Sequence, residues 1–195
     1  FDLYVLHDAP WRQRVQKFFD GIPAEIFVNP PAQVEQYFEE EGREGRPITA
    51  HMISTGFVVL DTRGEVRRLQ DRARQLLNQP PDTSEIQRTS QRYIAALLYE
   101  DAVDIADSRP ENASLILGVA VDAMLRYAFI AAGRTLPRHK EMLRTLEDLD
   151  PALAALAYAY FRATTTPERI DLAGQIADLT LGVRGFFEWE TPPGS

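Results

Sequence analysis

The 195-residue chain contains no cysteine and has few cations, and each shortage excludes a class of protein. Without cysteine there are no disulfides, thiolate zinc sites or thiol nucleophiles. The 21 basic residues against 29 acidic ones give a formal net charge of −8, whereas proteins that bind phosphate backbones are basic. No run of about 18 apolar residues occurs, so no membrane span is predicted. We therefore expect neither nucleic acid nor a membrane as a partner.

The start of the chain also lacks familiar features. Phe1-Asp2-Leu3 has no basic flank and carries an early acid, unlike a secretory signal, so we expect a cytoplasmic protein. The chain begins without Met inside a β-prone run, which favours a sequence taken from within a longer protein. A glycine-rich phosphate loop, a Gly-x-Ser-x-Gly elbow and a His-Glu-x-x-His motif are all missing, and with them the chemistries they support.

The two parts of the chain differ in pattern, and Pro80-Pro81-Asp82 is the best boundary between them. Residues 1–60 mix short β-prone runs with helical stretches, whereas residues 83–190 are helical nearly throughout. The fold class expected is α+β, with a mixed sheet and helices followed by an all-α up-and-down bundle. In the first part, strands are predicted at 3–6, 24–28 and 57–60, and helices at 11–19, around 34–38 and at 66–77.

Helix start and stop signals are strong in the second part. Ser84-Glu85-Ile86-Gln87 is a capping-box pattern, and Ser108-Arg109-Pro110-Glu111 is a second one with proline in the first turn. Gly133 follows a long apolar-periodic run and predicts a helix end there. Further helices are predicted at 138–149, 151–163 and 167–189.

Two acids stand on β-prone runs of the first part. Asp2 begins the first run and Glu25 lies in the second, so pairing of these strands would bring two carboxylates together. Paired carboxylates supply the charged oxygen ligands that hard divalent cations prefer. The alternative is a pair of exposed strand-end acids without a ligand.

A third acid, Asp101, falls on a predicted apolar stripe, with Asp104 one turn further on. Burying a carboxylate costs several kcal/mol unless it is paired or coordinated. Asp101 is therefore expected either to line a cleft or to form an ion pair, with Arg92 or Arg126 as candidates. The stripe is set by the spacing of Ile94, Leu97, Leu98 and Ile105.

The loop after Gly133 carries Lys140, which is one of only two lysines against 19 arginines. A cation at a helix start suits a phosphate group, and the alternative is a solvated turn. Arg134 and His139 in the same loop have a spacing that resembles that of HEPN-type ribonucleases.

Taken together, these segments resemble polymerase-β-like nucleotidyltransferases. Residues 1–5 look like the second half of the family's Gly-Ser…Asp-x-Asp strand motif, and residues 24–28 look like the strand that carries its third carboxylate. Residues 52–61 are similar to the closing strand of its minimal catalytic domain. The second part resembles the HEPN-like bundle of the kanamycin-nucleotidyltransferase C-terminal type, through Arg92-Tyr93, Asp101, Gly133-Arg134 and Lys140.

The resemblance implies a catalytic domain at 1–82, N-terminally incomplete, and a substrate-binding bundle at 83–195. It implies Mg²⁺-dependent transfer of a nucleoside monophosphate from an NTP, ATP by preference, to a hydroxyl of a small molecule, with release of pyrophosphate. An aminoglycoside-like antibiotic is one candidate acceptor, and a homodimer is a possible assembly. Asp2 and Glu25 would hold the metal, Glu25 completing the site. Asp101 would serve as general base and Lys140 would contact the nucleotide.

One departure from the family leaves alternatives open. The Gly-Ser motif and the first acid of Asp-x-Asp would precede Phe1, where this sequence has nothing. The second interpretation is therefore a non-catalytic or antitoxin-type nucleotidyltransferase–HEPN protein that acts by binding a partner. The third is a HEPN ribonuclease that uses Arg134 and His139.

Overall fold

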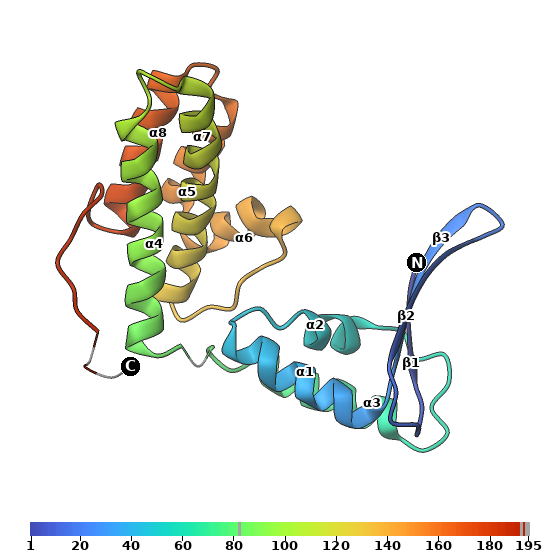
Figure 1. The fold of residues 1–195 in the computed structure, drawn as a ribbon. Coiled ribbons are helices and arrows are strands. Elements are labelled where there is room, and N and C mark those ends of the chain that lie inside the picture. Colours follow the sequence, from blue (N-terminus) through green and yellow to red (C-terminus); the bar gives the residue numbers. More distant parts are fainter. Residues whose placement is uncertain (82, 192, 194–195) are drawn as a thin grey trace. The chain divides into compact units, whose positions relative to one another are not determined.

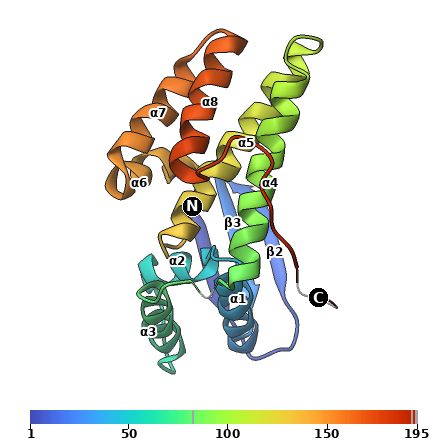
Figure 2. The same ribbon diagram turned by 90° about the vertical axis from the view of Figure 1, so that its left-hand side faces the viewer.

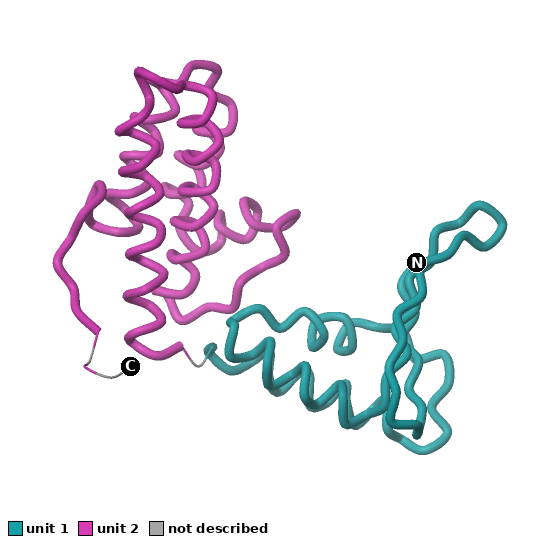
Figure 3. The backbone as a smooth tube through the Cα atoms, viewed as in Figure 1, with its two compact units in different colours: residues 1–82 teal, residues 83–195 magenta. Residues whose placement is uncertain are grey.

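The chain folds into two compact units, Phe1–Asp82 and Thr83–Ser195 (Figure 3). The computed structural model describes residues 1–81, 83–191 and 193. The first unit combines a small mixed sheet with helices, and the second is helical (Figure 1), which confirms the predicted α+β fold class. The predicted boundary at 80–82 includes Asp82, which lies outside the described residues.

The sheet of the first unit has three strands in the described residues, in the order β1-β3-β2. They span Asp2–Leu6 (β1), Gln13–Phe19 (β2) and Ile22–Asn29 (β3). β3 lies in the middle, parallel to β1 and antiparallel to β2. The strands predicted at 3–6 and 24–28 are confirmed.

The helix predicted at 11–19 is wrong, because most of this segment forms β2, which pairs with β3 in a hairpin. The two turn residues Asp20 and Gly21 both have positive φ angles, 48° and 79°. Two such residues make the type I′ turn whose twist matches that of paired strands, and Asp-Gly is among its preferred sequences. The apolar residues before the turn have helical spacing, but their pairing with β3 in the hairpin makes the segment a strand.

The first unit also contains three helices, which pack against one another: α1 (Pro31–Arg43), α2 (Ile48–Thr55) and α3 (Glu65–Leu77). α1 and α3 confirm the helices predicted around 34–38 and at 66–77, whereas α2 was not predicted. Tyr4 and Leu6 of β1 pack against the core that these helices form. That core consists of Val34, Phe38, Ala50, Ile53, Leu69 and Ala73.

The strand predicted at 57–60 is wrong, and so is the resemblance of residues 52–61 to a closing strand. The segment begins inside α2 and continues as an unpaired loop. Its ends are held by polar groups: Gln70 donates a hydrogen bond to the Gly56 carbonyl (2.8 Å), and Asp61 accepts from backbone N–H groups in the first turn of α3. An apolar, β-prone run therefore serves as a helix connection.

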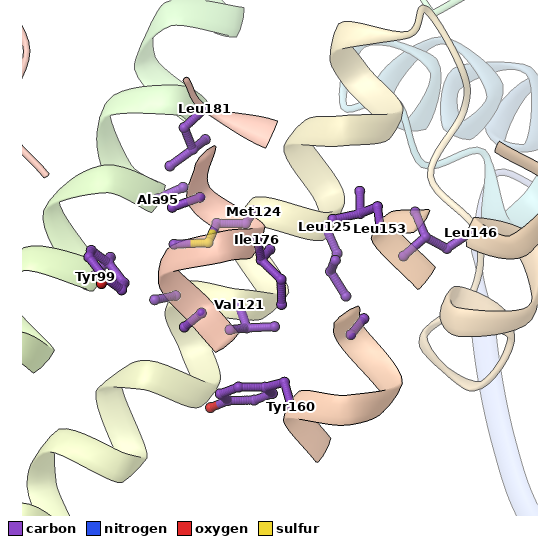
Figure 4. Close-up of a cluster of buried hydrophobic side chains, with 14 of the residues drawn as sticks. Ala95, Tyr99, Val121, Met124, Leu125, Leu146, Leu153, Tyr160, Ile176 and Leu181 are labelled. Atoms are coloured by element: carbon purple, nitrogen blue, oxygen red, sulfur yellow. The ribbon is translucent and has the colours of Figure 1, made fainter. Parts of the chain in front are cut away.

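The second unit places two long helices beside three shorter ones (Figure 2). Its elements are α4 (Glu85–Asp104), α5 (Pro110–Ala131), the 3₁₀ turn η1 (His139–Glu141), α6 (Met142–Leu149), α7 (Pro151–Arg162) and α8 (Thr166–Thr180). α4 and α5 lie side by side and run in opposite directions (Figures 1 and 2). Figure 4 shows the core where side chains from α4, α5, α7 and α8 converge, among them Tyr99, Val121, Met124, Tyr160 and Ile176.

The first predicted capping box is confirmed and the second is wrong. The Ser84 hydroxyl accepts from the Gln87 N–H (3.2 Å), and the Gln87 side chain accepts from the Ser84 N–H (2.9 Å). At α5 the cap residue is Arg109, with no side-chain cap. Ser108 instead donates its hydroxyl to the Ile105 carbonyl (3.3 Å), in the turn that follows α4. Ser108 therefore stabilises the turn between α4 and α5 and does not cap α5.

The predicted end of α5 at Gly133 is confirmed. Gly133 has φ = +63° and donates to the Ile130 carbonyl, and Arg134 donates to the Phe129 carbonyl, which together form a Schellman motif. The helix predicted at 167–189 ends much earlier, at Thr180.

Two glycines explain the early end of α8. Gly182 and Gly185 have φ angles of +68° and +112°, which continue no right-handed helix. The following segment lies against α4, where Arg92 donates to the Leu181 carbonyl (2.9 Å) and its guanidinium stacks over Phe187.

The face that α4 buries differs from the predicted one. Its buried residues are Ala95, Ala96, Tyr99 and Ala102, whereas Ile94 and Leu97 are exposed. Alanines let the helix backbone approach its neighbours closely, and Tyr99 supplies the bulk. Ile94 and Leu97 of the predicted apolar stripe therefore point outward, whereas Leu98 packs against the core.

α5 is long and apolar enough to cross a membrane by length and composition alone. The core helix of a bundle meets the same criteria, and α5 contributes eight buried residues to its unit. The length and composition of α5 therefore fit both a membrane span and a core helix. The absence of a membrane partner stays a prediction.

Replacing glycine by alanine should have opposite effects on stability at Gly133, which follows α5, and at Gly118, which lies inside α5. Gly133→Ala should destabilise the protein by about 1 kcal/mol, because an L-residue at φ = +63° brings its Cβ against the backbone. Gly118→Ala, inside the helix where a Cβ meets nothing within 4 Å, should stabilise by about 0.5–1 kcal/mol. Urea unfolding measures both. Equal losses in the two variants would contradict the Schellman assignment.

Candidate functional site

The strand register places the two predicted metal ligands next to each other. Asp2 of β1 is the direct partner of Glu25 of β3 in the parallel ladder. Neighbouring strands lie about 4.8 Å apart, and residues in register point to the same face. The expected proximity of the two acids is therefore present in the structure, whereas their role as metal ligands stays a prediction.

Glu25 is already engaged by two side chains of β2. Arg14 forms an ion pair with its carboxylate, and Gln16 donates a hydrogen bond to the same oxygen (3.1 Å). The Arg14 guanidinium also lies over the Phe27 ring, 5.2 Å from its centre. A cation at Glu25 would have to share the carboxylate with Arg14. Arg14 and Gln16 were not predicted as neighbours of Glu25, because a helix was expected over 11–19. The Asp20-Gly21 turn is the sequence signal that predicts the hairpin and places them beside Glu25.

The same face continues into an aromatic layer. Tyr4 stacks on Phe27 with ring centres 5.7 Å apart, and the buried Asn29 side chain donates to the Tyr4 hydroxyl (3.0 Å). Burial raises the pKa of Tyr4 far above its ordinary value, with the neighbouring Tyr37 adding to the effect. Tyr4 therefore stays neutral at physiological pH and serves as a support under the acids, not as a base.

The carboxylates of Asp2 and Glu25 suit a metal ion that takes most of its ligands from water and substrate. Among the described residues, no group of three or more His, Cys, Asp and Glu side chains is positioned to hold a metal. Mg²⁺ is commonly bound by one or two carboxylates, with water and substrate phosphates as its other ligands. Asp2 and Glu25 together match that minimal requirement.

Asp101 occupies a different environment from the one predicted. It is exposed on α4, and so is Asp104. The predicted ion pairs with Arg92 and Arg126 are wrong: Arg92 binds the Leu181 carbonyl, and Arg126 forms no ion pair within the described part of the chain. The role of Asp101 as a general base is independent of burial and stays a prediction.

Lys140 lies exposed in η1, in the loop between α5 and α6. Its neighbour His139 has its Nε2 atom 3.7 Å from the Asp122 carboxylate, halfway along α5. Arg138 forms an ion pair with Glu141, which lowers the pKa of that carboxyl. The loop therefore gathers several cations, whereas Asp2 and Glu25 belong to the other compact unit.

The fold of this chain is similar to that of a solved structure. The crystal structure of a nucleotidyltransferase-like protein from Exiguobacterium sibiricum 255-15 is similar to this chain, with a TM-score of 0.57 and 13% sequence identity. The likeness covers 92% of this chain and 61% of that one. No family model and no curated protein matches the sequence. At this identity the likeness shows a nucleotidyltransferase-like fold.

The aromatic layer predicts a stability difference between two tyrosines. Tyr4→Phe removes the acceptor of the buried Asn29 amide and should cost about 1–2 kcal/mol, because an unsatisfied buried donor loses its solvation. Tyr37→Phe is the matched control: its hydroxyl accepts from exposed Arg12, and its loss should cost less than about 0.5 kcal/mol. Chemical denaturation measures both. Equal costs would argue against a rigid layer below the acids.

Proposed function

We propose that this protein is a Mg²⁺-dependent nucleotidyltransferase that moves a nucleoside monophosphate from an NTP, ATP by preference, to a hydroxyl of a small molecule. The observation that carries the proposal is the register of Asp2 with Glu25 on a nucleotidyltransferase-like fold. Two carboxylates side by side on neighbouring strands suit the metal that such a reaction needs. A cytoplasmic location belongs to the same proposal.

In this proposal Asp2 and Glu25 hold Mg²⁺. When bound, the metal would neutralise phosphate charge and lower the pKa of an attacking hydroxyl. Arg14 forms an ion pair with the Glu25 carboxylate and would therefore compete with the metal for it. Tyr4 and Phe27 fix the strands below the acids, so that the two carboxylates keep their separation.

The second unit would act as a HEPN-like substrate-binding bundle. Lys140 would meet triphosphate oxygens, since an exposed ammonium is a compact point charge. Asp101 would take a proton from the acceptor hydroxyl. The acidic protein, with net charge −8, suits a cationic acceptor such as an aminoglycoside.

A second candidate function is a non-catalytic protein of the same fold that binds a partner. The observation in its favour is that Arg14 and Gln16 already engage Glu25, and that the described residues hold no group of three or more possible metal ligands. The ribonuclease interpretation rests on Arg134 and His139, and loss of RNA cleavage in His139→Ala would be its test.

The metal proposal predicts opposite effects at Glu25 and Arg14. Glu25→Gln should weaken Mg²⁺ binding roughly tenfold or more, because a charged ligand is lost. Arg14→Ala should strengthen it about two- to fivefold, the equivalent of a surface ion pair. Arg12→Ala is the control, since Arg12 bonds Tyr37 and not Glu25. Calorimetric titration with Mg²⁺ and Mg·ATP reads out all three.

Two outcomes of that titration decide between the candidate functions. Mg²⁺ binding that needs Glu25, with pyrophosphate released from NTP in the presence of hydroxyl acceptors, supports the transferase. Mg²⁺ affinity that is the same in the unmodified chain, Glu25→Gln and Asp2→Asn shows that the acids are structural and favours partner binding.

The nucleotide role predicts a difference between the two lysines. Lys140→Ala should weaken Mg·ATP binding or transfer by about 1–3 kcal/mol, the range of a lost charge-assisted contact. Lys140→Arg should recover only part of the loss, because the guanidinium differs in shape and reach. Lys17→Ala, at an exposed position of β2, is the control. Identical nucleotide affinities in Lys140→Ala and Lys17→Ala would assign Lys140 to a solvated turn.

A further inference from the structure

An exposed aromatic side chain lies on the same face of the sheet as the two acids of the candidate site. Phe18 of β2 is the direct partner of Pro23 of β3. Two residues earlier on β2, Gln16 is the direct partner of Glu25. Because the side chains of a strand alternate between the two faces, Phe18 shares the face of Gln16 and Glu25. Asp2 belongs to that face as well, since it is in register with Glu25.

The residues of this face pack against helices at one end of the sheet and are open to solvent at the other. Tyr4 and Leu6 pack against the core that α1, α2 and α3 form. Asp2 and Phe18 are exposed, and Glu25 is partly buried. In Figure 1 the turn end of the β2–β3 hairpin projects away from the three helices. A small molecule can therefore reach the acids and the Phe18 ring from the same side.

The two consecutive phenylalanines of the hairpin differ in face and in exposure. Phe18 is 76% exposed, whereas Phe19, which pairs with Ile22 on the opposite face, is 48% exposed. Burying an aromatic ring is strongly favourable, and a ring left as open as Phe18 makes little of that contribution within its own fold. Pro23 lies directly opposite Phe18, so two flat apolar rings stand next to the acids.

The spacing of the acids and the ring suits a ligand with a charged end and an aromatic end. Phe18 is the diagonal neighbour of Glu25, about 7–8 Å away. Asp2 lies one strand further, about 12 Å from Phe18 by the spacing and rise of β-strands. Phosphates bound through a metal at the acids would leave the sugar and base of a nucleotide to extend along the sheet toward Phe18.

We propose that Phe18 stacks on the base of the nucleoside triphosphate whose phosphates Asp2 and Glu25 bind through the metal. This inference rests on the proposed nucleotidyltransferase function and adds a base-binding residue to that site. Stacking needs no pattern of hydrogen bonds, because every base has a π-face. Purines offer a larger ring surface than pyrimidines. The site therefore prefers ATP and GTP to CTP and UTP, and it separates ATP poorly from GTP.

Titration of the full chain with Mg·ATP and with Mg·tripolyphosphate tests the proposal, because tripolyphosphate has the phosphates without the base. Phe18→Ala should weaken Mg·ATP binding roughly 5- to 150-fold and change tripolyphosphate binding less than about twofold. The preference for purine nucleotides should disappear in the same variant. Phe18→Trp should keep ATP binding, whereas Phe18→Leu, apolar but without a ring, should lose it as alanine does.

Phe19→Ala is the matched control, since Phe19 is the next residue of the hairpin and points to the opposite face. Its ATP affinity should equal that of the unmodified chain. Circular dichroism checks that every variant keeps its fold.

The fluorescence of Phe18→Trp provides a readout that is independent of nucleotide transfer. A base stacked on an indole quenches its emission, so Mg·ATP should quench this variant and Mg·tripolyphosphate should not. Trp11 and Trp189 also emit, and the response of the unmodified chain is subtracted to remove their contribution.

The outcomes separate failure of this inference from failure of the proposed function. Mg·ATP binding that needs Glu25 but is equal in the unmodified chain and Phe18→Ala overturns the stacking and leaves the transferase standing. Equal losses of ATP and tripolyphosphate affinity in Phe18→Ala also overturn it, because the residue then acts on the phosphates or on the hairpin. An unmodified chain that binds neither ligand overturns the inference and the proposed function together.

Discussion

The parallel pairing of β1 with β3 is the constraint on which the candidate site depends. Its register puts Asp2 beside Glu25 and Tyr4 beside Phe27, so one ladder sets both the acids and their aromatic support. A shift of one residue would turn these side chains to the other face. The hairpin turn at Asp20 and Gly21 in turn fixes where β2 meets β3, and with it the contact of Arg14 with Glu25.

Sequence patterns predicted the elements whose signals are local. The capping box at Ser84 and the Schellman end at Gly133 depend on hydrogen bonds within a few residues, and both are present. β2 was missed because its apolar residues also fit a helical period, and the I′ turn that decides between the two is a property of two residues only. The run at 57–60 shows the converse: β-prone residues form no strand where α2 and α3 hold the ends of the segment.

The buried face of a helix is harder to predict from sequence than the presence of the helix. α4 buries alanines and Tyr99, while Ile94 and Leu97 are exposed, so counting large apolar residues selects the wrong side. Alanine buries little area by itself, but it permits close approach to α5 and leaves the larger residues for the outer surface. The proximity of Asp2 and Glu25 was predictable because it needs only strand pairing, whereas the exposure of Asp101 depends on this choice of face.

The general-base role predicted for Asp101 places a demand on its surroundings. A general base must reach a substrate hydroxyl, which requires an open path from solvent. α4 turns its alanines and Tyr99 toward the neighbouring helices, and Asp101 is left exposed. The exposure that a general base needs therefore comes from the small residues that set the buried face of α4, while the role itself stays a prediction.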